Sequence, residues 1–191
     1  GMAQGAKVVC GVSTGAVDGS GLGLAAGVAG TGRGWITRNQ AVDRIGRIAR
    51  FLLGRTDRAK LHGALPRWLN GATGDAVNFD ANDTGADIVE TSFLMQGLLI
   101  ARAYFNGPGA EEELRRDITV LWEGVDWNWF TAGEDDGLYW HWTPERGHLG
   151  LKVTGYNECL VTYLLALASP THPISRRAYD HWTSRDDYQP K

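Results

Sequence analysis

Glu158 is the acid whose surroundings most suggest chemistry, because it stands near the start of an otherwise apolar run, residues 159–168. A helix that is apolar nearly all round is usually buried. A carboxylate that enters such a helix needs a partner, a solvated cavity or a raised pKa, since burying a bare charge is costly. An apolar aromatic wall raises the pKa of a carboxyl and suits it to donate a proton. The alternative is an acid that only complements the helix dipole.

Aromatic residues are dense upstream of Glu158. They are Trp127, Trp129, Phe130, Tyr139, Trp140 and Trp142. Aromatic rings stack on the apolar faces of sugars, and carboxylates cleave glycosidic bonds. The combination suggests carbohydrate chemistry. The candidate substrate-binding residues are Trp68, Tyr139, Trp140, His141, Trp142 and Asn157. The competing interpretation is core packing, which we expect for Trp122 and which also suits Trp127 and Trp129.

A second group of acids, Asp83, Asp87 and Glu90, is spaced i, i+4, i+7. On a helix this spacing places all three on one face, near the N-terminal end. We predict that they line a cleft with Glu158 and are catalytic. The alternative is that acids favour a helix N-terminus and that one of them caps it.

Five helices are expected to form the body around these residues, and one of them holds Glu158 and stops before Pro170. Residues 20–30 are small and apolar and predict a closely packed helix. Thr37 and Gln40 have capping-box spacing and open a helix that Gly54 closes. Two further helices are predicted at 82–105, capped by residue 82, 83 or 84, and at 110–123.

Two hairpins are expected between the helices. Residues 65–69 and 76–79 flank the turn sequence 70–74, which would place Trp68 on a loop above the helices. Residues 127–130 and 139–142 alternate around an acidic, Gly-containing turn and predict a second hairpin or an extended loop. The overall expectation is an all-α body with functional loops.

Composition limits the function classes. The 191 residues have a net charge of −3, so the composition lacks the excess of positive charge that is typical of nucleic-acid-binding proteins. No apolar run approaches the ~20 residues of a membrane span. Cys10 and Cys159 form neither a disulfide framework nor a zinc pattern. The histidines lack metal-ligand spacing, and Gly21-x-Gly23 is only a fragment of a dinucleotide fingerprint. We therefore predict no metal, no cofactor and neither a nucleic-acid nor a membrane partner.

Several longer motifs resemble the bacterial "putative glucoamylase" family, which includes the endo-β-1,2-glucanases. The motifs are Arg33-Gly-Trp-Ile-Thr37, residues 62–71, residues 83–97, Tyr139-Trp-His-Trp-Thr-Pro144, Asn157-Glu158 and Ser169-Pro-Thr-His-Pro173. The resemblance implies an (α/α)6 toroid with a central cleft and hydrolysis of a glucan with inversion. It places Glu158 on the family's essential glutamate, the candidate proton donor. It places Asp83, Asp87 and Glu90 on the acidic cluster of the cleft.

The resemblance covers part of the family domain. We expect an atypical segment at 1–19, the N-terminal half of the toroid at 20–175 and a tail at 176–191. Exposed helix faces predict self-association. Family members are often periplasmic or secreted, yet the chain has no clear signal peptide. The predicted function is hydrolysis of a glucose polymer, and the favoured substrate is β-1,2-glucan. The alternatives are an exo-acting glucoamylase and a non-catalytic carbohydrate-binding or remnant domain.

Overall fold

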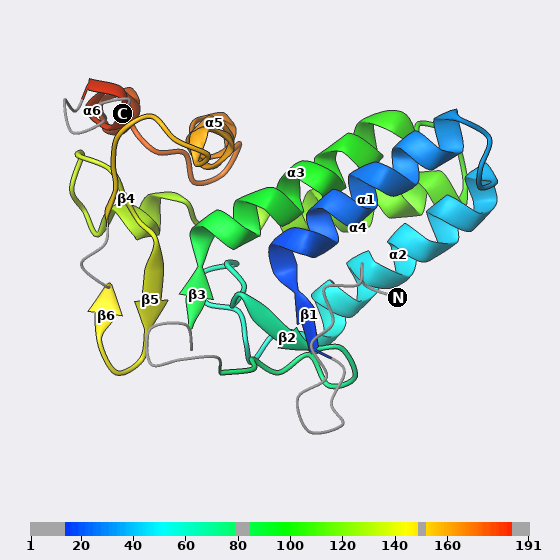
Figure 1. The fold of residues 1–191 in the computed structure, drawn as a ribbon, viewed down its shortest axis with the longest axis horizontal. Helices are drawn as coiled ribbons and strands as arrows, with labels where there is room; N and C mark the ends of the chain where they lie inside the picture. Colours follow the sequence, from blue (N-terminus) through cyan, green and yellow to red (C-terminus); the bar gives the residue numbers. More distant parts are fainter. Residues whose placement is uncertain (1–13, 79–84, 149–151, 185–191) are drawn as a thin grey trace.

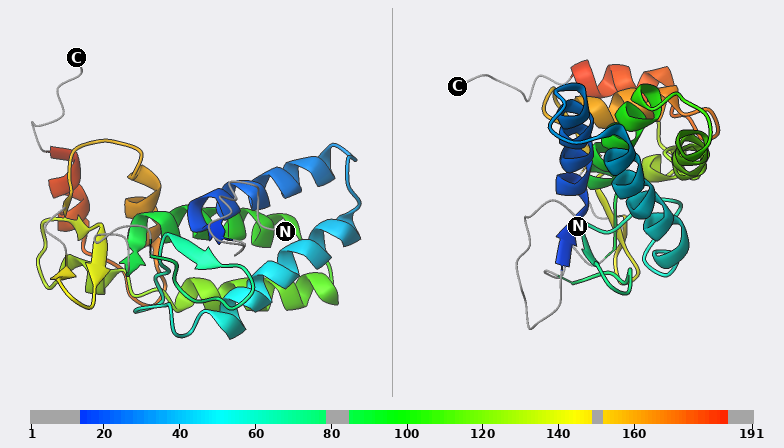
Figure 2. Two further views of the ribbon diagram at one scale, coloured as in Figure 1. Left: turned by 60° about the horizontal axis from the view of Figure 1, so that its bottom comes forward. Right: turned by 90° about the vertical axis from the view of Figure 1, so that its right-hand side faces the viewer.

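The computed structural model describes residues 14–78, 85–148 and 152–184. Four helices form one end of the molecule, and short strands with two more helices form the other (Figures 1 and 2). The helices are α1 (Val17–Gly32), α2 (Arg38–Arg55), α3 (Ile88–Tyr104), α4 (Ala110–Glu123), α5 (Leu160–Ala168) and α6 (Arg176–Ser184).

Helices α1 and α3 lie side by side with their backbones in contact (Figure 1). A Cβ atom added to Gly21 would lie 2.1 Å from the carbonyl oxygen of Phe93, and one added to Gly97 would lie 2.2 Å from that of Gly21. Only glycine allows this approach. The prediction of a small-residue helix at 20–30 is confirmed, and the reason for its glycines is this contact.

Local signals define α2 and α4 well. Thr37 forms the predicted capping box with Gln40, and α2 packs against α4. Gly54 lies inside α2 and does not close it, because the helix runs on to Arg55 and its C-cap is Thr56. The predicted helix at 110–123 is confirmed with the same bounds.

Short antiparallel strands connect the helices into one body. They are β1 (Thr14–Ala16), β2 (Trp68–Asn70), β3 (Ala86–Asp87), β4 (Leu138–Tyr139), β5 (His141–Thr143), β6 (Gly147–His148) and β7 (Lys152–Val153). The described strands pair as β1–β2, β3–β5–β6 and β4–β7. The turn at 70–74 is confirmed, because Val77 N donates to Trp68 O at 2.9 Å across it. Trp68 therefore lies on a strand, not on a loop as predicted.

Two further predictions are wrong. Residues 127–130 are not a strand, because Asn128–Thr131 form a 3-10 helix. Residues 138–143 instead pair with β3, β6 and β7. Helix α3 begins at Ile88, because residues 86–87 are extended and pair with β5. The residues predicted to cap it, 82–84, lie outside the described residues.

The body is mainly helical with small strands in its connections, as expected. The core runs from the four-helix end to α5 and α6, where the ring of Tyr163 stacks on that of Trp182 with centroids 4.6 Å apart. The Tyr163 hydroxyl donates to Val153 O and accepts from Leu138 N. This side chain fixes the β4–β7 pair to α5.

Candidate functional site

Asp87 caps α3 and is completely buried. Its Oδ1 accepts from the backbone N–H of Glu90 at 2.9 Å. Its Oδ2 accepts from Trp140 Nε1 at 3.1 Å and lies 3.0 Å from His141 Nε2. The β3–β5 register makes this possible, since it sets Asp87 opposite His141. Asp87 thus holds two predicted substrate-binding side chains against the start of a helix.

Glu90 lies in the first turn of α3, and only 8% of its side chain is exposed. Its Oε1 lies 3.5 Å from Arg67 Nε, whereas its Oε2 is buried without a hydrogen-bond partner among the described residues. Burial raises the pKa of Glu90 to about 8, and the charges of Asp87 and Asp18 add to the effect. A carboxyl with this pKa is largely protonated at neutral pH.

Glu158 is exposed in the turn before α5. The helix begins two residues later, so Glu158 is not inside it. The side-chain oxygen of Asn157 accepts from the backbone N–H of Cys159 at 3.0 Å, which shapes the turn. This hydrogen bond fixes the backbone on both sides of Glu158.

Cys159 links the two acidic segments. Its thiol is buried, and its pKa is raised to about 12 by burial and by the negative charges of Glu158, Asp87 and Glu90. The hydroxyls of Ser92 on α3 and Thr162 on α5 lie 2.7 Å apart, so the first turns of these two helices are in contact. The start of α3 and the turn before α5 therefore meet around Cys159.

The helical spacing predicted for Asp83, Asp87 and Glu90 is wrong in its geometry. Asp87 has extended backbone angles and precedes the helix, so it does not share a helical face with Glu90. Asp83 lies outside the described residues. The structure brings together Asp87, Glu90 and Glu158 from the predicted catalytic set.

The aromatic candidates form a half-buried layer on β4–β6. The ring of Trp140 stacks on that of His141 with centroids 5.7 Å apart. Trp142 meets the edge of Trp129 at 5.8 Å. Lys152 Nζ lies 4.9 Å from the ring of Tyr139. Trp68 lies on the separate β1–β2 sheet, opposite Ala16.

Sequence reasoning misses three contributors to this site: Asp18, Arg67 and Cys159. Asp18 lies in α1, within the Gly-rich first 19 residues, where no spacing signal exists. Arg67 precedes β2, and its carbonyl accepts from Val17 N at 3.0 Å. Cys159 stands in an apolar run, where a cysteine most simply fills space. Their proximity to the acids comes from chain segments far apart in sequence.

Two histidine rings pack against the aromatic residues of this site. The ring of Trp129 lies 4.2 Å from that of His62 and 4.3 Å from that of His148. Burial and the charge of His62 lower the pKa of His148. A neutral, half-buried imidazole beside indole rings suits contact with uncharged ligands.

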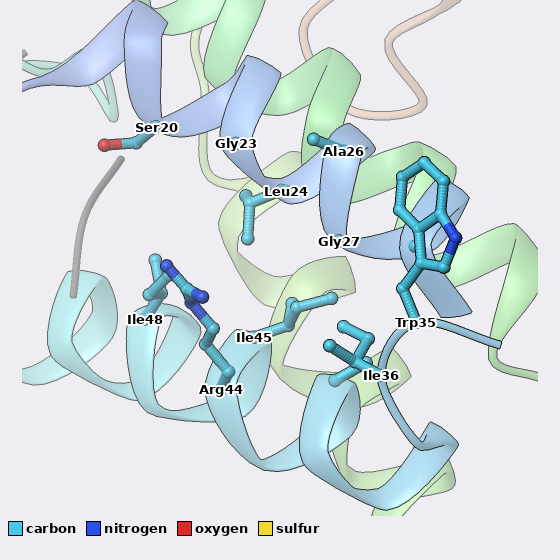
Figure 3. A pocket seen from close by; sticks show the side chains of 12 residues that line it. Ser20, Gly23, Leu24, Ala26, Gly27, Trp35, Ile36, Arg44, Ile45 and Ile48 are labelled. Carbon is cyan, nitrogen blue, oxygen red and sulfur yellow. The ribbon is translucent and has the colours of Figure 1, made fainter. Parts of the chain in front are cut away.

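A separate groove of about 350 Å³ lies between α1 and α2 (Figure 3). Its lining is mostly apolar, from Leu24 on α1 to Ile45 and Ile48 on α2, and Arg44 reaches toward it. None of the acids lines it. The groove therefore lies apart from the acids around Cys159.

Neither a metal cluster nor a membrane span is found in the described part of the chain. No group of three or more His, Cys, Asp or Glu side chains there is arranged to hold a metal ion. None of the described helices combines the length and the apolar character that a bilayer crossing requires.

Comparisons with known proteins confirm the resemblance that the motifs indicated. A family model described as "Putative glucoamylase" matches residues 150–191. The chain is 43% identical over 182 residues to an exo β-1,2-glucooligosaccharide sophorohydrolase (non-reducing end) of Parabacteroides distasonis. That match covers 93% of this chain and 24% of the relative.

Solved structures show the same similarity. An endo-β-1,2-glucanase from Chitinophaga pinensis, in complex with sophorotriose and glucose, is 39% identical with a TM-score of 0.86; the match covers 97% of this chain and 48% of that one. A "putative glucoamylase" from Bacteroides uniformis is 36% identical with a TM-score of 0.87, over 97% of this chain and 47% of that one. The chain thus spans about half the length of these structures and a quarter of the curated relative.

Proposed function

We propose that this chain supplies the acid-bearing part of a β-1,2-glucan hydrolase, with Glu158 as the proton donor. The observation that carries the proposal is the exposed position of Glu158 beside two buried acids, around Cys159. Solvent and a saccharide can reach Glu158. The names of the two β-1,2-glucan-active relatives supply the substrate class.

Protonation of the glycosidic oxygen by Glu158 would release the leaving sugar as an alcohol. In an inverting reaction a second carboxylate removes a proton from the attacking water, about 6.5–9.5 Å from the acid. Asp87 is fully buried and its oxygens already accept from neighbouring donors, so we assign it a positioning role. Glu90 is also buried. Asp83, the remaining member of the predicted catalytic set, lies outside the described residues.

Trp140, His141 and Trp142 are the proposed sugar-binding side chains nearest the acids. Asp87 orients the first two, so their ring planes are set before substrate arrives. Preorganised rings lose little conformational entropy on binding. Tyr139 and Asn157 flank this layer on β4 and in the Glu158 turn, and Trp68 stays a more distant candidate on β2.

The burial of Asp87 and Glu90 also favours a second candidate, a carbohydrate-binding or remnant domain without turnover. This candidate predicts oligosaccharide binding that depends on Trp140 or Trp142, with no release of reducing ends. An exo-acting glucoamylase would instead release glucose from starch.

One experiment separates these functions. The protein is incubated with β-1,2-glucan or starch, and new reducing ends and oligosaccharide sizes are measured. Hydrolysis of β-1,2-glucan that Glu158→Gln abolishes supports the proposal. Binding without turnover supports the second candidate, and glucose release from starch supports the third. Sedimentation velocity over a range of concentrations tests the predicted self-association.

A further inference from the structure

Asp18 faces the acid site from the first turn of α1. The contact between α1 and α3 places it there, since Gly21 meets the backbone of Phe93 and Leu94. Asp18 lies almost one turn before Gly21, and Glu90 almost one turn before Phe93 and Leu94. Two helices that run side by side in the same direction bring such positions together.

The start of α1 is also held in place by backbone bonding. Val17 N donates to Arg67 O at 3.0 Å, and β1 pairs with β2 immediately before it. Arg67 is the cation that reaches Glu90, and its side chain is 45% exposed. The hydrogen bond from Val17 N to Arg67 O and the β1–β2 pairing thus hold both Asp18 and Arg67 beside Glu90.

The charges around Glu90 do not balance when every acid is ionised. The described groups that face it are Asp18 from α1, Arg67 from the segment before β2, Asp87 from β3 and the Cys159 thiol from the turn before α5. Of the described groups, Arg67 is then the half-exposed guanidinium that Asp18 and Glu90 face, whereas Asp87 also has His141 Nε2 at 3.0 Å. Glu90 Oε2 is moreover buried with no hydrogen-bond partner among the described residues. A buried, unpartnered carboxylate oxygen is costly, and a proton removes most of that cost.

We propose that Asp18 is a positioning residue of the acid site. Its carboxylate keeps Glu90 protonated, so that the two carboxyls pair across the α1–α3 contact instead of repelling each other. The inference rests on the proposed function only for its effect on hydrolysis. A neutral Glu90 adds no negative charge beside Asp87, which accepts from Trp140 Nε1. An ionised Glu90 would add a negative charge beside Asp87. It would also repel the Asp18 carboxylate, which destabilises the contact between α1 and α3.

The raised pKa of Glu90 agrees with this arrangement, and the Asp18 carboxyl contributes to it by charge and by hydrogen bonding. Asp18→Asn keeps the shape of the side chain but removes its charge. Glu90 should therefore lose its proton at lower pH in this variant. In Glu90→Gln no proton remains to be lost.

Infrared spectroscopy measures the proton directly. The difference spectrum between the wild type and Glu90→Gln isolates the carbonyl stretch of protonated Glu90, and its intensity is followed with pH. We expect a midpoint near pH 8 in the wild type, lower by about one pH unit in Asp18→Asn. Asp43→Asn on α2, an exposed acid paired with Arg47, is the matched control and should leave the midpoint unchanged. No protonated Glu90 at pH 6, or an unchanged midpoint in Asp18→Asn, overturns the proposal.

Thermal unfolding covers the case in which Asp18→Asn does not fold. The melting temperature of Glu90→Gln should fall less between pH 5 and pH 8 than that of the wild type; equal falls contradict the proposal. Where hydrolysis is present, the alkaline limb of the kcat/KM profile should move to lower pH in Asp18→Asn, with activity at acid pH retained. The spectroscopic and thermal tests need no substrate, so absent hydrolysis would reject the proposed function and leave this inference standing.

Discussion

At the start of α3, Asp87 and Glu90 are buried, whereas Glu158, in the turn before α5, is exposed. The first segment is fixed by strand pairing, a helix cap and a glycine-tight helix contact. The second is a turn shaped by one side-chain hydrogen bond. Acids gathered at one place therefore need not have the same role. In the proposed function the buried pair positions neighbouring side chains, and the exposed acid is the one that meets a substrate.

Exchanging Glu158 for glutamine is the strongest test of this division. Glu158→Gln should lower hydrolysis of β-1,2-glucan by about 10²–10⁴-fold, since that is the usual contribution of a positioned proton donor. The fold should be unaffected because Glu158 is exposed. Reducing-end release is measured together with thermal unfolding. Glu145→Gln, another exposed acid, is the control, and equal activity of the two variants would end the assignment.

Removing Asp87 should instead affect stability. Asp87→Ala loses the α3 cap and leaves the Trp140 and His141 donors without their acceptor. We expect a loss of about 2–5 kcal/mol in the free energy of unfolding, measured with urea. Asp87→Asn keeps a capping oxygen and should lose less. A stable Asp87→Ala protein that is merely inactive would make Asp87 a reacting group and break the comparison.

The glycine contact can be tested separately. A Cβ in Gly97→Ala would overlap the carbonyl oxygen of Gly21 at 2.2 Å and push α1 from α3. The expected cost is about 1–3 kcal/mol in urea unfolding. Gly27→Ala on α1 is the control, because its Cβ meets nothing within 4 Å and should stabilise the helix by about 1 kcal/mol. Equal effects of the two changes would show that the contact is not tight.

Glu90 should also make the stability of the protein depend on pH. Its pKa is raised from 4.5 to about 8 in the folded protein, so folding is favoured when the proton is bound. This stability is fully present below about pH 4.5 and is lost as pH rises through about 8. Glu90→Gln should flatten the fall in melting temperature in that window by up to about 10 °C, because a pKa raised from 4.5 to about 8 corresponds to several kcal/mol. Asp75→Asn, an exposed acid beyond β2, should not, and a similar flattening there would assign the effect to net charge.

Much of the helical body follows from the sequence. The Thr37–Gln40 capping box and the 110–123 stripe each depend on neighbours within a few positions. The predicted start of α3 is wrong because Ala86 and Asp87 pair with a strand more than 50 residues away. The hairpin or extended loop expected at 127–142 is also not formed, because residues 128–131 form a 3-10 helix and the partners of β4 and β5 lie outside this range.

The candidate site shows the same division. Residue types alone identify the acids, the indole rings and the chemistry they suit. They cannot place Asp18 beside Glu90, give Asp87 its donors, or separate a buried acid from an exposed one. Those properties depend on long-range packing: the contact of two glycines, the register of a two-residue strand and the turn before α5. Local sequence determines which groups are present, and packing between distant segments determines which of them keep a proton, a partner or access to water.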